Sequence, residues 1–90
     1  MEKVLEAIPM EAYRIRVRLE SGLEGIFDMS PYLNGPAFHE LKDPVYFKQV
    51  RPEGCGITWP HEQDISADTI LCDILATQAE GVLSKKSQDR

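Results

Sequence analysis

Three arginines at alternate positions, Arg14, Arg16 and Arg18, form the clearest group of residues in this sequence that could do chemistry. In an extended strand these side chains share one face and lie about 7 Å apart. Guanidinium groups bind phosphates and carboxylates through paired hydrogen bonds. The ladder therefore has two interpretations. It is either a surface for nucleic acid or an acidic partner, or a solvated strand face whose arginines pair with Glu20 and Glu24 across a hairpin.

The cysteines and histidines form a second group of candidate residues. Zinc sites use these residue types at short, recurrent spacings such as C-x₂-C. The spacings of Cys55, His61 and Cys72 are irregular, and His39 would have to supply a fourth ligand. The sequence therefore predicts no metal site, and it contains no motif that implies a cofactor.

A cysteine nucleophile is the enzyme hypothesis that these residues allow. It would need Cys55 or Cys72 within hydrogen-bonding distance of His61, with Asp64 completing the site. No spacing in the sequence requires that arrangement, and the chain lacks G-x-S-x-G, a P-loop and G-x-G-x-x-G. We therefore expect that this protein is not an enzyme.

Trp59 also has two interpretations. It either anchors a sheet in the core or lies exposed at a binding surface. The residues after it have local structural roles, because Asp64 suits a turn and Ser66 suits the start of a helix. Trp59 joins the three arginines in the set of candidate binding residues.

The composition is that of one small globular domain. The chain has 90 residues, of which 42% are hydrophobic, and its net charge is −5. Such a chain is not attracted as a whole to nucleic acid or anionic lipid. It has no apolar run of roughly 20 residues and no signal-peptide pattern. We therefore expect a soluble cytoplasmic protein with no membrane partner, and two cysteines fit a reducing compartment.

The first half of the chain predicts strands. Apolar residues alternate with the arginines over residues 12–20, which predicts the clearest strand, after an apolar stretch that ends at Pro9. Ser21-Gly22 predicts a tight turn, and residues 23–28 predict the returning strand. Gly25 within that strand predicts a bulge or a close approach of another segment.

Short helical pieces and a second hairpin follow. Ser30-Pro31 predicts a helical turn, and two further helical pieces are expected over residues 36–41 and 44–49. Asp43 is the expected cap of the second piece. A Gly-rich turn followed by β-branched and aromatic residues predicts another hairpin, and residues 64–65 close the sheet.

The second half of the chain predicts a long helix that Ser66 caps and that runs to about Leu83. Its apolar residues recur at helical spacing on one face, which covers either the chain's own sheet or a second copy. Ile70, Ile74 and Leu75 are the candidate residues of a homodimer interface, since two-fold dimers are the commonest oligomers. After the helix, residues 84–90 are polar and predict a disordered tail.

Together these elements predict one α+β domain over residues 1–83, with a small antiparallel meandering β-sheet, a short helical insert and a C-terminal amphipathic helix.

A series of short motifs runs through this domain in a fixed order. The motifs are Tyr13-Arg14-Ile15-Arg16-Val17, Glu20-Ser21-Gly22, Phe27-Asp28-Met29-Ser30-Pro31-Tyr32-Leu33, Gly35-Pro36-Ala37-Phe38, Leu41-Lys42-Asp43-Pro44, Phe47-Lys48-Gln49-Val50, and Trp59-Pro60 followed by Asp64-Ile65-Ser66-Ala67-Asp68. The series resembles the uncharacterised bacterial family catalogued as domain of unknown function 2442, over residues 4 to about 75.

The resemblance implies a small α+β domain and brings no established catalytic residues. Some relatives look fused to a helix-turn-helix DNA-binding segment, and others look like the antitoxin of a toxin–antitoxin pair. This sequence departs from the fused form, because only the tail from Ser84 follows the helix. Direct DNA recognition is therefore not implied here.

Three functional hypotheses follow, from different classes. The leading hypothesis is a protein-interaction module, with an antitoxin-like role as its most specific form, which binds a protein partner or a second copy of itself. The acidic balance of the chain suits a basic partner. The alternative is a nucleic-acid-associated regulator that uses Arg14, Arg16 and Arg18. The third is a small enzyme.

Overall fold

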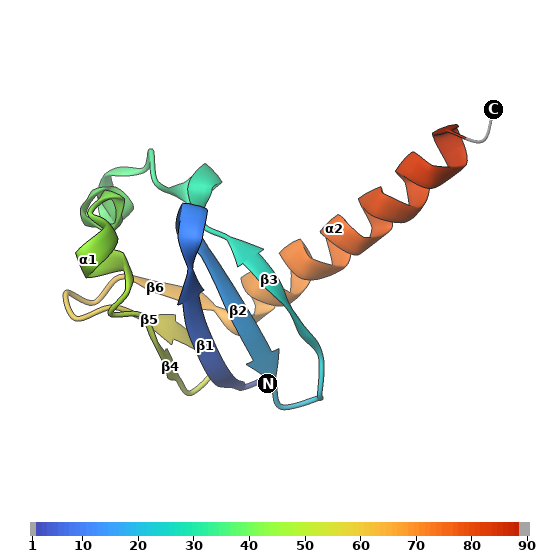
Figure 1. The fold of residues 1–90 in the computed structure, drawn as a ribbon. Helices are drawn as coiled ribbons and strands as arrows, with labels where there is room; N and C mark the ends of the chain where they lie inside the picture. Colours follow the sequence, from blue (N-terminus) through green and yellow to red (C-terminus); the bar gives the residue numbers. More distant parts are fainter. Residues whose placement is uncertain (1, 89–90) are drawn as a thin grey trace.

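The computed structural model describes residues 2–88 of the chain. Two small antiparallel sheets, one long helix and several short helical segments make up an α+β fold (Figure 1), so the predicted fold class is confirmed. The strands are β1 (Val4–Met10), β2 (Arg14–Leu19), β3 (Glu24–Asp28), β4 (Arg51–Glu53), β5 (Gly56–Thr58) and β6 (Asp64–Ser66). The helical elements are η1 (Glu11–Tyr13), η2 (Ser30–Tyr32), η3 (Pro36–Lys42), α1 (Pro44–Phe47) and α2 (Ala67–Gln88).

The strands form two sheets where the sequence predicted a single one. Sheet A has the order β1-β2-β3 and sheet B has the order β4-β5-β6. The helical insert between β3 and β4 carries the chain away from β3, so β4 starts a new sheet beside β1. The N–H of Val4 donates to the carbonyl of Gly54 at 3.1 Å, which joins the two sheets at this point.

The middle strand of sheet A has the predicted alternation. Ile15, Val17 and Leu19 are fully buried, and the arginines between them point to the opposite face. The strand begins two residues later than predicted, because Ala12 and Tyr13 have φ values of 61° and 58°. Those left-handed conformations belong to the tight turn between β1 and β2 and cannot continue a strand.

The first strand of sheet A continues through Pro9, where the sequence predicted an end. Pro9 stands opposite Ile15 in a strand that has β2 on one side only. An edge strand tolerates proline because the missing N–H can face away from the ladder. The register of β1 also shifts between Val4 and Glu6, which is a bulge at the start of this edge.

Gly25 marks a close approach of α2, which was one of the two predicted reasons for a glycine in this strand. A Cβ atom at position 25 would lie 2.8 Å from Cγ2 of Ile74. The register of β2 with β3 is continuous at Gly25, so no bulge is present. The missing side chain therefore lets α2 pack directly on the core face of β3.

The caps predicted at Asp43 and Ser66 are both present. A side-chain oxygen of Asp43 accepts from the N–H of Val45 at 3.0 Å, and the Ser66 hydroxyl accepts from the N–H of Thr69 at 3.2 Å. At the helical turn that begins at Ser30, the predicted cap was the side chain of Ser30. In the structure the carboxylate of Asp28 instead accepts a hydrogen bond from the N–H of Ser30.

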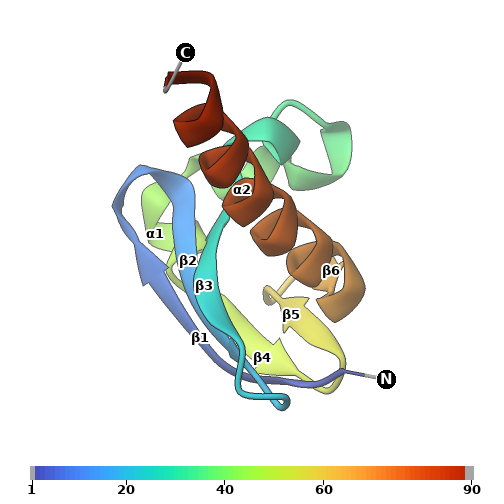
Figure 2. The same cartoon turned by 90° about the vertical axis from the view of Figure 1, so that its right-hand side faces the viewer.

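The long helix α2 covers the chain's own sheets with its first half and then extends away from them (Figures 1 and 2). Ile70 and Ile74 are buried in the common core. The phenol of Tyr32 donates to Asp73 at 2.8 Å, and burial, with this hydrogen bond, raises the pKa of Tyr32. The helical backbone continues to Gln88, beyond the predicted end, and residues 89–90 of the predicted tail lie outside the described residues.

Candidate functional site

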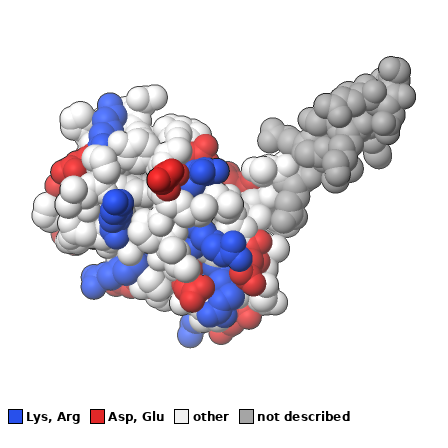
Figure 3. Space-filling view, viewed as in Figure 1, with Lys and Arg blue, Asp and Glu red and all other residues white. Residues whose placement is uncertain are grey.

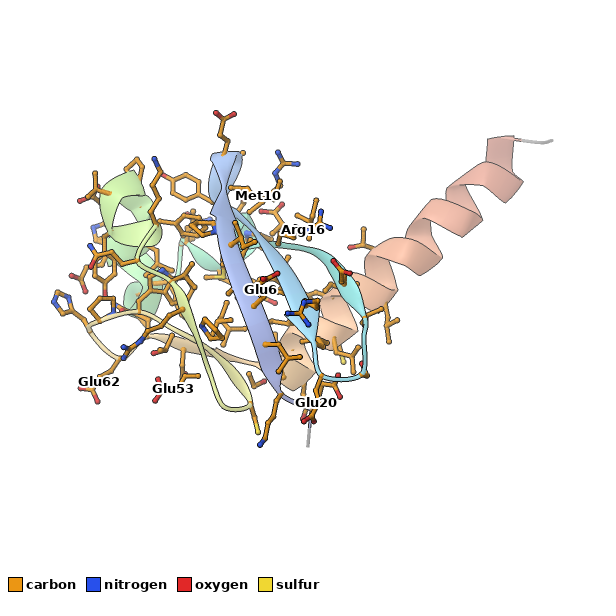
Figure 4. The ribbon with its side chains drawn as sticks, turned by 60° about the horizontal axis from the view of Figure 1, so that its bottom comes forward. Glu6, Met10, Arg16, Glu20, Glu53 and Glu62 are labelled. Carbon is orange, nitrogen blue, oxygen red and sulfur yellow. The ribbon has the colours of Figure 1, made fainter. Side chains whose placement is uncertain are left out.

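The outer face of sheet A presents the arginine ladder to solvent. The strand register places each arginine between one residue of β1 and one of β3. Figure 4 shows Glu6, Met10 and Arg16 over sheet A, whereas Glu53 and Glu62 lie over sheet B. The outer face consists of three cross-strand rows: Glu6, Arg18 and Glu24; Ile8, Arg16 and Ile26; and Met10, Arg14 and Asp28.

Two of the three arginines of the outer face have acidic partners, one on each flanking strand, whereas Nε of Arg14 donates to the carbonyl of Glu11 at 3.3 Å. A guanidinium nitrogen of Arg16 lies 3.1 Å from the Glu24 carboxylate, and Nε of Arg18 lies 3.7 Å from the Glu6 carboxylate. Pairing with Glu24 is therefore confirmed. The prediction of Glu20 was wrong, because β1 supplies the second partner and its pairing with β2 was not foreseen. Positive and negative side chains are intermingled on the view of Figure 3.

Two large apolar side chains flank the central arginine of this face. Ile8 is 45% exposed and Ile26 is 43% exposed, and both stand directly opposite Arg16 in the register. Interface cores are depleted in most charged residues and enriched in arginine, with apolar area around it. The middle row thus has the composition of a protein-binding surface.

A groove continues the outer face around the edge of β3. It has a volume of about 340 Å³, and Ile26, Gly25 and Arg16 contribute its sheet side. Ile74 and Thr77 contribute its helix side. The Ile74 side chain occupies the position that a Cβ atom of Gly25 would take, so this close contact between β3 and α2 borders the groove.

Trp59 belongs to the core, so the interpretation as an exposed binding residue was wrong. It is 1% exposed, and its indole N–H donates to the carbonyl of Phe47 at 2.9 Å. The rings of Trp59 and Phe47 also pack together, with their centroids 6.2 Å apart. A buried indole with a satisfied N–H has a structural role.

The candidate dimer residues on α2 do not share one surface. Ile70 is fully buried and Ile74 is 3% exposed, and both pack in the chain's own core. A second copy could reach them only by opening that packing. Leu75 is 48% exposed and is the one residue of the three that lies at the surface. A homodimer stays a prediction, and its interface would have to exclude the two isoleucines.

The cysteines, His61 and Asp64 do not assemble into the site that the enzyme hypothesis requires. Cys55 and Asp64 border a hollow of about 470 Å³ beside sheet B, and His61 is not among the residues that line it. Cys72 lies exposed on α2. Among the described residues, no group of three histidine, cysteine or acidic side chains is arranged to hold a metal ion.

His61 instead belongs to a polar cluster that joins the loop between β5 and β6 to the helical insert. Its Nδ1 lies 2.6 Å from one oxygen of Glu40, and the amide nitrogen of Gln63 donates to the other oxygen at 2.9 Å. The hydroxyl of Tyr46 donates to Gln63 and accepts from the backbone N–H of His61. The hydrogen bonds from Gln63 and His61 lower the pKa of Glu40.

Sequence reasoning missed Glu40 and Gln63 because no local signal connects them. The two residues are 23 positions apart, and each alone is an ordinary exposed or half-buried polar residue. The cluster leaves Nε2 of His61 without a hydrogen bond to the described residues and brings no nucleophile to it. Its evident effect is to fasten one loop to one helix.

Comparison with known proteins finds one family. A family model described as "Protein of unknown function (DUF2442)" matches residues 4–74, which include both sheets and the part of α2 that packs on them. No curated protein and no solved structure matches this chain. Within the described residues, no helix is both long enough and apolar enough to cross a membrane.

Proposed function

This chain belongs to the DUF2442 family, whose function is unknown, and from its surface we propose that it is a protein-interaction module. In this proposal the outer face of sheet A binds a partner protein, with Arg16 at its centre. The expected cytoplasmic location is part of the same proposal.

The middle row of the outer face carries the proposal. Ile8 and Ile26 are nearly half exposed on a regular sheet, with Arg16 between them. Burying these isoleucines against a partner would favour binding by roughly 25 cal/mol per Å² of apolar area removed from water. Arg16 is held by Glu24, so its guanidinium is already oriented when a partner arrives.

The charges on the outer face argue against phosphate as the ligand. Three arginines stand among three carboxylates, those of Glu6, Glu24 and Asp28, so the formal charge of the nine-residue face is zero. Binding a phosphate backbone depends on uncompensated positive charge. A phosphate group would have to compete with the carboxylates that already hold Arg16 and Arg18.

An antitoxin-like role is the most specific form of the proposal. The chain carries a net charge of −5, which complements a basic partner and would speed the encounter with it. In this form, the partner is a small basic protein encoded beside this one, and binding blocks its activity.

The first experiment purifies the tagged chain together with the protein that is encoded next to it and measures their affinity by calorimetry. The double variant Ile8→Asp, Ile26→Asp should weaken binding at least tenfold, because two buried charges would replace two apolar contacts. Val45→Asp is the matched control, since Val45 is 71% exposed on α1. It should bind like the unmodified chain.

Two results would contradict the proposal. One is equal loss of binding in the Val45→Asp control and in the double variant. The other is tight binding of DNA or RNA at low salt that disappears in an Arg16→Ala, Arg18→Ala variant. The antitoxin-like form has its own readout, which is rescue of growth when the chain is co-expressed with its neighbour.

A further inference from the structure

On the side away from β2, β3 pairs with no other strand of the described residues, so this backbone edge is free within them. Alternate residues of an antiparallel strand turn their N–H and C=O groups toward the same neighbour. Toward β2, these groups include the carbonyl of Leu23, which accepts from Leu19, and the N–H of Met29, which donates to Tyr13. Residues at even positions of β3 therefore direct their backbone groups away from β2.

The residues with outward backbone groups are Glu24, Ile26 and Asp28. No other described strand pairs with this side of β3. Their side chains are all exposed, and Ile74 and Thr77 of α2 lie beside this edge across the groove. A row of unpaired N–H and C=O groups is a template for the addition of another strand.

The other three sheet edges in the described chain are protected in ways that β3 is not. β1 has a bulge at its start, contains Pro9 and lies beside β4. β4 contains Pro52, which lacks a backbone N–H. β6 has only three residues before α2 begins. Such devices are the usual means by which sheets avoid pairing with other chains.

A groove accompanies the free edge. Figure 2 shows α2 crossing β3, and Ile74 and Thr77 of α2 face Ile26 across a space of about 340 Å³. An added strand would bond to β3 on one side and place alternate side chains against the helix. A strand edge beside a helix is one of the recurring modes of peptide recognition.

We propose that β3 is the docking site for an extended, basic segment of a partner protein, which joins sheet A as a fourth strand. The inference rests on the proposed interaction function and specifies where and how the partner binds. The backbone supplies the pairing, and the groove beside Ile26 receives an apolar side chain.

The charges along β3 favour a basic strand over a second copy of this chain as the segment that pairs with its edge. Glu24 and Asp28 are its only charged residues, and both are acidic. A second copy that paired antiparallel about Ile26 would set each Glu24 opposite an Asp28 of the other copy. Like charges directly opposite each other destabilise a strand pair. A basic segment would instead gain a favourable cross-strand pair with Asp28 and would share the Glu24 carboxylate with Arg16, which lies 3.1 Å from it.

The test uses a synthetic nine-residue peptide, Lys-Val-Thr-Val-Arg-Val-Thr-Val-Lys with both ends blocked, and the full chain. We expect binding by calorimetry and slowed exchange of the Ile26 amide hydrogen by NMR, because a new hydrogen bond protects it. The same peptide with glutamate in place of its three basic residues should bind at least tenfold more weakly.

Ile26→Pro removes the central N–H of the edge, and its ring obstructs the approach of a strand. It should lower the affinity for the basic peptide at least tenfold. The ladder with β2 does not use this N–H, so the variant should keep its circular dichroism spectrum. The isosteric pair Glu24→Gln, Asp28→Asn preserves the backbone and should lower the affinity roughly three- to tenfold.

Val45→Asp is the matched control, because Val45 is 71% exposed on α1 and belongs neither to the outer face nor to β3. Equal peptide binding by Val45→Asp and loss by Ile26→Pro support the edge site. Three results would overturn it: no binding of the basic peptide, equal binding of the acidic peptide, or dimerisation of the chain that Ile26→Pro abolishes. If the edge site fails while Ile8→Asp, Ile26→Asp still releases the natural partner, the interaction function stands without it.

Discussion

Sheets A and B both have three antiparallel strands, but they are stabilised in different ways. The strands of sheet A have five to seven residues, and the inner side of the central strand is fully buried. Each strand of sheet B has three residues, so few ladder hydrogen bonds hold it. Contacts outside the ladder support it instead, including the Trp59 indole and the hydroxyl of Thr58, which donates to the carbonyl of Gln63 at 2.8 Å.

The difference shows how a small domain can leave one edge open. Regular strands and a helix packed at Gly25 make sheet A self-supporting, so its outer face and the edge of β3 need no cover. Sheet B is too short to stand alone and is held by side chains that link it to the helical insert. We therefore expect substitutions on sheet A to affect binding. Near sheet B, we expect removal of a single side-chain contact to lower the stability of the fold.

The largest effect is expected from Trp59→Ala, at the residue that directly follows β5 of sheet B. Removing a buried tryptophan costs about 3–5 kcal/mol, a large part of the roughly 5–15 kcal/mol that stabilises a typical domain. Urea unfolding should be followed by circular dichroism, because Trp59 is the only tryptophan in the chain. Trp59→Phe keeps a ring but removes the indole donor, so the Phe47 carbonyl retains only the N–H of Val50 at 3.3 Å, and the variant should cost about 1–3 kcal/mol. A loss below 1 kcal/mol for Trp59→Ala would remove the proposed dependence of sheet B on this residue.

In sheet A, Gly25→Ala should cost about 1–3 kcal/mol, because the new methyl group would overlap Ile74. Ile74→Val removes part of the obstacle, so the double variant should lose less stability than the two single variants together. Gly22→Ala is the control. Its φ of 98° makes alanine strained, but nothing lies within 4 Å of the added methyl, so Ile74→Val should not relieve its cost. Additive effects of Gly25→Ala and Ile74→Val would contradict the direct contact.

A smaller, pH-dependent effect is expected from the polar cluster beside sheet B. The folded-state pKa of Glu40 lies below its ordinary value of 4.5, so the unfolded chain binds its proton more readily. Its stabilising contribution is present above pH 4.5 and is lost as the pH falls through the folded-state value. Glu40→Gln should therefore lower the free energy of unfolding at pH 7 and flatten its decline in acid.

The matched control for Glu40 is Glu53→Gln, which removes an exposed carboxylate that makes no hydrogen bond or ion pair with the described residues. It should leave the acid slope of the unfolding free energy nearly unchanged. An identical slope for Glu40→Gln and the unmodified protein, measured by urea titration from pH 7 to pH 3, would exclude Glu40 as a source of acid sensitivity.

The smallest effect on stability is expected from the arginines of sheet A. Their ion pairs with Glu24 and Glu6 are solvent-exposed, and such pairs contribute about 0–1 kcal/mol each. Arg16→Ala and Arg18→Ala should therefore shift the urea midpoint only slightly, and by less at high salt. A loss of several kcal/mol would mean that the ladder is structural and would weaken the case for a binding face.

Local patterns in the sequence determined much of this fold. Alternating apolar residues specify the inner face of β2, because successive strand side chains point to opposite sides. Asp43 and Ser66 cap their helices within three residues of themselves, so their roles can be read locally. Gly25 predicted either a bulge or a close approach of another segment, and only the structure decided for the close approach.

Only the tertiary structure decided which segments meet. The division into two sheets, the partner of Arg18 on β1 and the link between Glu40 and Gln63 depend on contacts between residues far apart in the chain. Helical periodicity also does not determine whether Ile70 and Ile74 face their own sheet or a second copy, because packing against either surface would bury the apolar side chains. The free edge of β3 is likewise a property of strand order, and strand order is set by the packing of the whole chain.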